Sequence, residues 1–326
     1  MHNLLGLRFS PWRPWIAPSR LLLTLILACG SICPRPSFAG ERVAPLPRIS
    51  EEAFKSRLPF FDYDKAVPLE GRVVREWSQQ ENRKQKIVFR GAQGFLVPGY
   101  IEFPKTDAKR YPLVLLLHGW SGSKEDWYTD DNFISGGAMR KALIKAGYAI
   151  LALDAATHGE RGNEIDYQHV NAFEDPKAPP RRNYFTFAEI SIQTVKDYRR
   201  GLDFLAERGE VDMSRIGLVG YSMGGMDSFY LLSVERRIRV AVACVPPLTS
   251  AGYGPASPID YCWGIGKTPF LMLMGRKDEM GDPAKVEASY HEYIETPNTK
   301  LIWYDQGHKL TDIYVPDALE WIKKHL

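Results

Sequence analysis

Short apolar runs recur along the chain from residue 112 onward, and segments with apolar residues at helical spacing separate them. Continuous runs of this kind are typical of strands in a parallel sheet that helices cover on both faces. The predicted strands are residues 112–117, 148–153, 215–220, 239–245, 270–274 and 300–304. The predicted helices are residues 134–146, 184–208, 225–233, 282–294 and 311–325. This alternation predicts the α/β class, with a mainly parallel sheet and helices on both of its faces.

The N-terminal part of the chain follows a different pattern. Residues 40–85 are rich in proline and charge, and we expect them to form an extension on the outside of one α/β domain at residues 86–326. Two segments of the extension have helical potential, 50–57 and 69–80. The domain should begin with two strands that form an antiparallel hairpin at a sheet edge, 86–90 and 94–103.

The first 39 residues have the pattern of a secretory signal peptide. Three arginines precede an apolar stretch at 21–29, and Ser-Phe-Ala at 37–39 places small residues at the cleavage positions. We predict cleavage after Ala39 and an exported protein, either periplasmic or secreted. The alternative is a lipoprotein signal that ends at a lipid-modified Cys29. The apolar stretch is shorter than the ~20 residues that a transmembrane helix needs, so no stable membrane span is expected after cleavage.

Composition and charge argue against some classes of partner. The 326 residues are 44% apolar and 25% charged, as in ordinary globular proteins. The formal charge of +3 becomes −1 when the four arginines of residues 1–39 are removed, so the remaining chain has no basic field that would favour nucleic acid. Cys244 and Cys262 follow this segment, and an oxidising compartment would allow them to pair. Cys244 lies within an apolar run, and we favour a buried, unpaired thiol there.

A Gly-x-Ser-x-Gly motif, Gly-Tyr-Ser-Met-Gly at 220–224, follows one predicted strand and precedes a predicted helix. In this context the motif predicts a nucleophile elbow, a strained turn that presents the serine hydroxyl and needs glycines on either side. The motif alone arises by chance in about one chain in ten of this length. Its position between a strand and a helix is therefore the stronger reason for predicting Ser222 as a nucleophile.

An activated serine needs a base, and the base needs a third group that orients it. With a nucleophile elbow, these groups follow in the order serine, acid, histidine. Asp278 and His308 each come after one of the last two predicted strands, so both should meet Ser222 at the carboxyl edge of the sheet. We therefore predict a catalytic triad of these three residues. The nearest alternatives for the acid are Glu279 and Asp282.

Acyl transfer also needs backbone N–H groups that stabilise an oxyanion. One expected donor is Met223, the residue after the nucleophile. The second should come from the loop after the strand at 112–117, which begins His118-Gly119-Trp120. We assign this donor to the Trp120 N–H, and Gly119 would let the backbone approach the substrate oxygen.

Taken together, these motifs resemble the α/β-hydrolase superfamily over residues 86–326. Residues 154–162 (Asp-Ala-Ala-Thr-His-Gly-Glu-Arg-Gly) look like a segment of bacterial esterases related to the dienelactone-hydrolase and prolyl-oligopeptidase-like groups. The resemblance implies the α/β-hydrolase fold and a serine hydrolase that cleaves a small or medium carboxylic ester through an acyl-enzyme, with no cofactor and no metal. Dienelactone hydrolases use a cysteine nucleophile, so Ser222 does not imply that particular activity.

The resemblance further implies a pocket wall and a small lid or rim in residues 155–183. The expected substrate-binding residues are His118, Tyr221, His158 and Arg161. Other residues of this stretch could bind an acidic or sugar-like substrate or be ordinary exposed loop residues, namely Tyr167, Phe173, Arg181 and Arg182. A metal site is the disfavoured alternative for three residues in this region, Asp154, His158 and Glu160, since an H-G-E-R loop in this family shapes the pocket wall.

Two functional alternatives to the esterase stay open. One is another hydrolase of the same fold, either an acyl-peptidase or a polysaccharide deacetylase. Residues 40–85 are too few for the propeller domain of prolyl oligopeptidases, which favours the esterase. The other alternative is a non-catalytic hydrolase-like binding protein, although such proteins usually lose a triad residue. The sequence determines neither the acyl chain length nor the oligomeric state.

Overall fold

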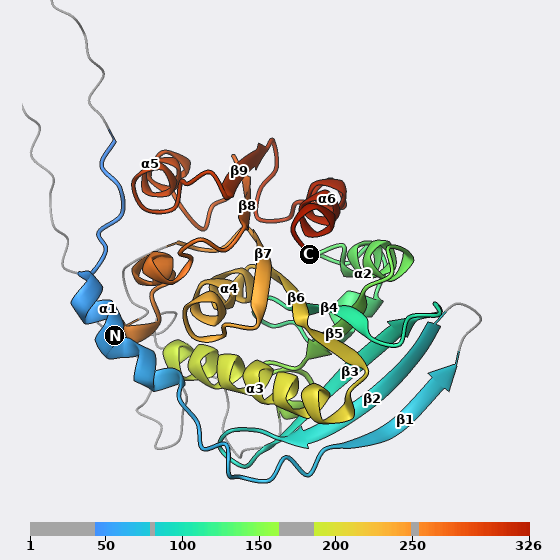
Figure 1. Cartoon of the computed structure of the whole chain (residues 1–326). Helices are drawn as coiled ribbons and strands as arrows, with labels where there is room; N and C mark the ends of the chain where they lie inside the picture. The colour runs from blue at the N-terminus through green and yellow to red at the C-terminus, as the bar shows by residue number, and fades with distance from the viewer. Residues whose placement is uncertain (1–42, 79–81, 163–185, 249–253) are drawn as a thin grey trace, which may run out of the picture. The chain divides into compact units, whose positions relative to one another are not determined.

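The computed structural model describes residues 43–78, 82–162, 186–248 and 254–326, and Val43–Leu326 form one compact unit. In the described residues the centre of this unit is a nine-stranded sheet with the order β1-β2-β3-β5-β4-β6-β7-β8-β9 (Figure 1). The strands are β1 (Arg72–Ser78), β2 (Asn82–Arg90), β3 (Leu96–Pro104), β4 (Tyr111–Leu117), β5 (Ala149–Leu153), β6 (Val211–Tyr221), β7 (Ile238–Cys244), β8 (Phe270–Gly275) and β9 (Thr299–Tyr304).

Strand directions divide this sheet into two parts. The β1–β2, β2–β3 and β3–β5 pairs are antiparallel, and all pairs from β5 to β9 are parallel. The predicted mainly parallel sheet is therefore confirmed, and so is the antiparallel hairpin, which is β2 and β3. Its predicted place at the sheet edge is wrong, because β1 pairs with the outer side of β2. All parallel strands of the sheet end at one edge, where the loops that follow them gather.

Helices cover both faces of the sheet (Figure 1). They are α1 (Glu51–Arg57), α2 (Gly136–Lys145), α3 (Phe187–Arg208), α4 (Met223–Val234), α5 (Pro283–Tyr293) and α6 (Val315–His325). Buried residues of α1, α3, α4 and α5 belong to one hydrophobic core, and those of α2 and α6 belong to a second core. The two cores lie on opposite faces of the sheet, so the central strands are apolar on both sides.

β4 shows why continuous apolar runs form these strands. Successive side chains of a strand point to opposite faces. Accordingly, Leu113, Leu115 and Leu117 lie in the core with α3 and α4, and Val114 and Leu116 lie in the core with α2 and α6. All five side chains are at most 1% exposed. Burial of each side chain contributes about 1.5–3 kcal/mol to the stability of the fold, so a polar residue at any of these positions would be destabilising.

Capping residues explain where two of the helices begin. Thr186 and Glu189 form a capping box at the start of α3, so this helix begins at Phe187, three residues after the predicted start. Asp282 caps α5 and accepts the Ala284 N–H at 3.0 Å, with Pro283 in the first turn, as predicted.

The described part of the predicted helix 69–80, residues 69–78, corrects that prediction, because it is not helical. Residues Arg72–Ser78 form β1, which pairs with β2 at the sheet edge. Two valines and a tryptophan make the segment a good strand former, and pairing with β2 satisfies the backbone groups on one of its sides. The other helical segment predicted in this region is confirmed as α1, with Ser50 as its N-cap.

Residues 43–85 pack into the same unit as the rest of the chain. Phe54 and Phe61 are buried in the core that contains α3 and α4, with their rings 5.7 and 5.6 Å from that of Tyr261. The predicted boundary after residue 85 falls inside β2.

Among the residues that the structure describes, no helix combines the length and apolar character needed to cross a membrane.

Cys244 is buried in β7, as predicted, and Cys262 is buried as well. Both thiols are free, and burial raises the pKa of Cys262 to about 12, which makes it a poor nucleophile.

Candidate active site

The turn between β6 and α4 has the geometry of a nucleophile elbow. Ser222 stands between the last residue of the strand and the first of the helix, with φ 54° and ψ −114°. A positive φ is strained for a serine. The flanking glycines are required by space, because a Cβ on Gly220 would lie 2.0 Å from the Gly224 carbonyl oxygen, and one on Gly224 would lie 2.2 Å from that of Leu117.

The three residues predicted as a triad lie in one chain of contacts. The Ser222 Oγ is 2.7 Å from His308 Nε2, and His308 Nδ1 is 2.8 Å from an oxygen of Asp278. A carboxylate only accepts, so Nδ1 carries the hydrogen and Nε2 of the neutral ring accepts the serine hydroxyl. The side chains of His308 and Asp278 are 12% and 5% exposed, so their contact is shielded from water.

Two structural features hold the acid and histidine loops. A Cβ on Gly275 would lie 2.2 Å from the Gly307 carbonyl oxygen, so the two loops touch through their backbones. The hydroxyl of Tyr221 donates to the His308 carbonyl at 2.9 Å and accepts the Leu310 N–H at 2.8 Å. Tyr221 is fully buried, and these two contacts position the histidine loop. Its substrate-binding role stays a prediction.

The loop after β4 passes beside the nucleophile. A Cβ on Gly119 would lie 3.3 Å from Ser222 Cβ, so this glycine lets the backbone reach the serine. Met223 is the first residue of α4, where backbone N–H groups have no partner within the helix. The two predicted oxyanion donors, Trp120 and Met223, therefore lie on segments that meet at Ser222.

His118 is buried at the start of this loop, and its ring bonds to backbone on both sides. Nε2 accepts the Ala155 N–H at 3.0 Å, so Nδ1 carries the hydrogen and donates to the Gly119 carbonyl at 2.8 Å. Burial lowers the pKa of His118, which keeps the ring neutral. Both nitrogens are used, so the ring joins the loops after β4 and β5. The substrate-binding role of His118 stays a prediction.

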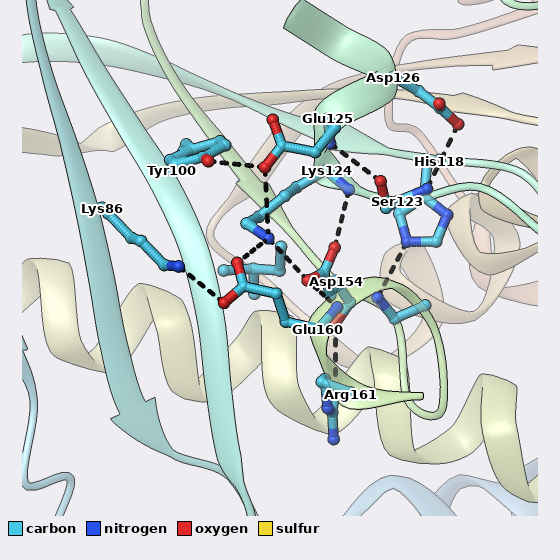
Figure 2. A network of polar contacts seen from close by, with 12 residues as sticks. Lys86, Tyr100, His118, Ser123, Lys124, Glu125, Asp126, Asp154, Glu160 and Arg161 are labelled. Carbon is cyan, nitrogen blue, oxygen red and sulfur yellow. Dashed lines mark hydrogen bonds and ion pairs between the residues drawn. The ribbon is translucent and has the colours of Figure 1, made fainter. Parts of the chain in front are cut away.

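A buried lysine joins the same two loops (Figure 2). Lys124 Nζ lies 2.8 Å from Asp154 and 2.6 Å from Glu160, and the Lys124 N–H donates to the other Asp154 oxygen at 2.8 Å. Burial disfavours the lysine charge, but the two carboxylates outweigh burial and raise the pKa of Lys124. Sequence reasoning missed Lys124, because a lysine in a polar loop has no local signal of burial.

The same contacts bear on the alternative of a metal site. The lysine ammonium occupies the place between Asp154 and Glu160 that a cation would need. His158 directs its Nδ1 at the Ala156 carbonyl, 2.9 Å away. These side chains are engaged with one another and with backbone, so this donor set does not fit a metal ion.

Arg161 also has a structural role. Its Nη1 donates to the Asp154 carbonyl at 3.1 Å and pairs with Asp197 of α3 at 2.9 Å, with both side chains at most 2% exposed. These contacts fix the guanidinium between the loop after β5 and α3, and the contact with Asp154 is drawn in Figure 2. The substrate-binding role of Arg161 stays a prediction. The other arginines and aromatics predicted at the rim lie outside the described residues, namely Tyr167, Phe173, Arg181 and Arg182.

An apolar wall stands beside the oxyanion segments. The Trp120 ring lies 5.0 Å from that of His158 and 5.5 Å from that of Phe187 at the start of α3. Four buried residues complete this cluster, Ala155, Ala156, Ile190 and Met223. His158 therefore stays a candidate for shaping the pocket through its ring.

Comparison with known proteins places this fold in a family. The profile of the alpha/beta hydrolase family matches residues 114–313, which is more than half of the chain. The chain is 22% identical over 179 residues to YtaP of Bacillus subtilis (strain 168), a hydrolase by name. The aligned residues cover 54% of this chain and 56% of that protein. The chain thus spans about half the length of the curated relatives it matches.

Two solved structures share the fold over most of their length. One is the acetyl xylan esterase from Paenibacillus sp. R4, with a TM-score of 0.63, 19% identity, and 87% of this chain and 98% of that chain covered. The other is acetyl xylan esterase 1 from Thermoanaerobacterium sp. JW/SL YS485, with a TM-score of 0.64, 18% identity, and 86% and 95% covered. At these identities a structural match establishes the fold. From its sequence match and its fold, the chain belongs to the alpha/beta hydrolase family.

Proposed function

We propose that this protein is a serine esterase that cleaves a small or medium carboxylic ester through an acyl-enzyme. The observation that carries the proposal is the chain of contacts from the Ser222 hydroxyl through His308 to Asp278, at 2.7 and 2.8 Å. A serine in a strained turn beside an oriented histidine is the arrangement that activates a hydroxyl for acyl transfer.

The proposed reaction has two halves. His308 Nε2 takes the hydroxyl proton as Ser222 Oγ attacks the ester carbonyl carbon, and Asp278 stabilises the imidazolium that forms. The backbone N–H groups of Trp120 and Met223 hold the oxyanion. When the ester C–O bond breaks, His308 returns the proton to the alcohol. His308 then takes a proton from water as the water oxygen attacks the acyl carbon. The bond between this carbon and Ser222 Oγ breaks, His308 returns the proton to Oγ, and the acid is released.

The apolar wall of Trp120, His158 and Phe187 supports the ester class of substrate. This wall adjoins the predicted oxyanion donors, where the acyl group of a bound ester would lie, and its bulky, partly or fully buried rings limit how long that group can be. A polysaccharide deacetylase is the second candidate, because two solved structures of the same fold are acetyl xylan esterases by title. An acyl-peptidase is the third, and acyl esters, acetylated xylan and acylated peptides as substrates distinguish the three.

The first test is labelling with a fluorophosphonate followed by peptide mass mapping. We expect the label on Ser222, and we expect Ser222→Ala and His308→Ala to lose it without loss of fold. Turnover should fall by about 10⁴-fold or more in Ser222→Ala, since the attacking atom is gone. Unchanged turnover in that variant contradicts the proposal. Absence of label on folded wild-type protein would instead favour a non-catalytic binding protein.

We further propose that the protein is exported, on the basis of the arginine-rich start and the apolar stretch at residues 21–29. The segment lies outside the described residues. Mass spectrometry of protein expressed in a bacterium with its native N-terminus tests this. A mature chain that begins at Gly40 supports cleavage after Ala39, a lipid on Cys29 supports the lipoprotein alternative, and an intact Met1 overturns both.

A further inference from the structure

Phe133 exposes a large apolar ring beside the candidate catalytic histidine. It lies between the 3-10 helix Lys124–Tyr128 and α2, and its exposed fraction is 52%. Its ring centroid is 6.2 Å from that of His308 and 6.3 Å from that of Tyr221. An exposed phenylalanine costs solvation free energy, and this one stands where the reaction would occur.

The backbone on both sides of Phe133 is fixed. The Asn132 amide donates to the Asp126 carbonyl at 2.7 Å and accepts the Gly136 N–H at 3.0 Å. On the other side, the buried Ile134 accepts the Tyr314 hydroxyl on its carbonyl at 2.8 Å. The exposed ring is therefore presented by an anchored segment, and its place beside His308 follows from these bonds.

The chemistry of ester cleavage determines which part of a substrate comes to this ring. His308 Nε2 returns its proton to the leaving alkoxide, so that oxygen must lie within about 3 Å of Nε2. The carbonyl oxygen would point to the oxyanion donors, and in the proposed esterase the acyl group lies against the wall of Trp120 and Phe187. The alcohol therefore leaves on the histidine side, where Phe133 stands.

We propose that Phe133 is a specificity-determining residue that receives the alcohol part of the ester, and that this alcohol carries a ring with an apolar face, either aryl or sugar. This inference rests on the proposed esterase function. An aromatic side chain binds such a ring by stacking or edge contact, and the gain beyond buried area is typical of aromatic pairs. A straight-chain alcohol would cover the ring less well.

Three acetate esters test the inference, because phenyl acetate, a methyl xyloside monoacetate and ethyl acetate all form the same acetyl-enzyme. Deacylation is then common to all three. The value of kcat/KM reports substrate binding and acylation, which are the steps in which the alcohol part is still present. For Phe133→Ala we expect the ratio of kcat/KM for a ring alcohol to that for ethyl acetate to fall about tenfold, and Phe133→Trp to restore it. Phe60→Ala is the matched control, because Phe60 is similarly exposed, at 49%, and lies on the 3-10 helix Leu58–Phe61 that follows α1. This variant should leave every ratio unchanged.

The possible outcomes separate the inference from the proposed function. A fall confined to phenyl acetate identifies an aryl alcohol, a fall confined to the xyloside identifies a sugar, and either supports the role of Phe133. Equal effects on all three esters, or none, overturn it. Failure of the wild-type protein to hydrolyse any ester or to label at Ser222 contradicts the esterase itself, and this result does not involve Phe133.

Discussion

Single residues decide how closely the loops approach the nucleophile, and Gly119 is the clearest case. A methyl group there would lie 3.3 Å from Ser222 Cβ, tighter than most real contacts, so either the loop or the serine must shift. We expect Gly119→Ala to lower kcat/KM by about 10- to 100-fold, since a small misplacement of reacting groups is costly. The free energy of unfolding should change by less than about 1 kcal/mol.

The matched control for this variant is Gly162→Ala, whose added Cβ would have its nearest neighbour at 3.4 Å, an ordinary contact. Steady-state kinetics and urea unfolding of both variants make the comparison. Full activity in Gly119→Ala would show that the loop does not approach the serine as described.

Asp227 in α4 is a second case, because its carboxyl is 1% exposed and one of its oxygens has no hydrogen-bond partner among the described residues. Burial raises its pKa well above the ordinary range, and nearby Ser191 opposes this only in part. The folded state therefore holds the proton more tightly than the unfolded state. The free energy of unfolding should be highest below the ordinary carboxyl pKa. It should fall as the pH rises toward the raised pKa of Asp227 in the folded protein.

Asp227→Asn removes this dependence. We expect the free energy of unfolding of the variant, minus that of wild type, to rise by about 1–3 kcal/mol from pH 4 to pH 8. Urea unfolding of both proteins at the two pH values measures the difference. A constant difference across this range would mean that the carboxyl is already ionised in the folded protein.

At the scale of elements, the Lys124 contacts join β4 and β5 through the loops that follow them. Removing the ammonium leaves the buried Asp154 carboxylate without its partner, which typically costs about 3–5 kcal/mol. We expect Lys124→Met to lose about that much, and Lys124→Met combined with Asp154→Asn to recover part of it. Lys141 and Asp130 offer a control pair, because they make a 2.6 Å contact and their side chains are 57% and 56% exposed.

In that control, Lys141→Met should cost less than about 1 kcal/mol, because water screens an exposed pair. Denaturant unfolding at pH 7 gives both values. Similar losses for the buried and exposed lysines would contradict the description of Lys124 as the ion that holds the two loops.

At the scale of the whole molecule, residues 43–85 are part of the folded unit. Phe54 and Phe61 fill its core, and Arg57 pairs with Asp260 at 2.7 Å. Loss of two buried phenylalanines costs about 3–5 kcal/mol each, which is comparable to the whole stability of a domain. We therefore expect residues 43–326 to unfold in one cooperative transition.

A chain that begins at Lys86 should have no such transition, since it also lacks β1 and half of β2. Calorimetry of the two chains makes the test. A cooperative transition of residues 86–326 near the wild-type temperature would show that the N-terminal segment is dispensable.

The sequence by itself determined which segments form the central strands, where the elbow lies, and in which order Ser222, Asp278 and His308 follow the strands. These features depend on local periodicity and turn chemistry, which a single stretch of chain contains. The start of α5 was predictable for the same reason, because Asp282 and Pro283 act within one helical turn.

Only the tertiary structure decided the burial and partners of polar side chains. His118, Tyr221 and Arg161 have residue types suited to substrate binding, yet each bonds to backbone or side chains from segments distant in sequence. Lys124 and β1 were missed for the same reason. Whether a lysine is buried or an amphipathic segment pairs as a strand depends on which segments meet it, and periodicity along one stretch of chain does not contain that information.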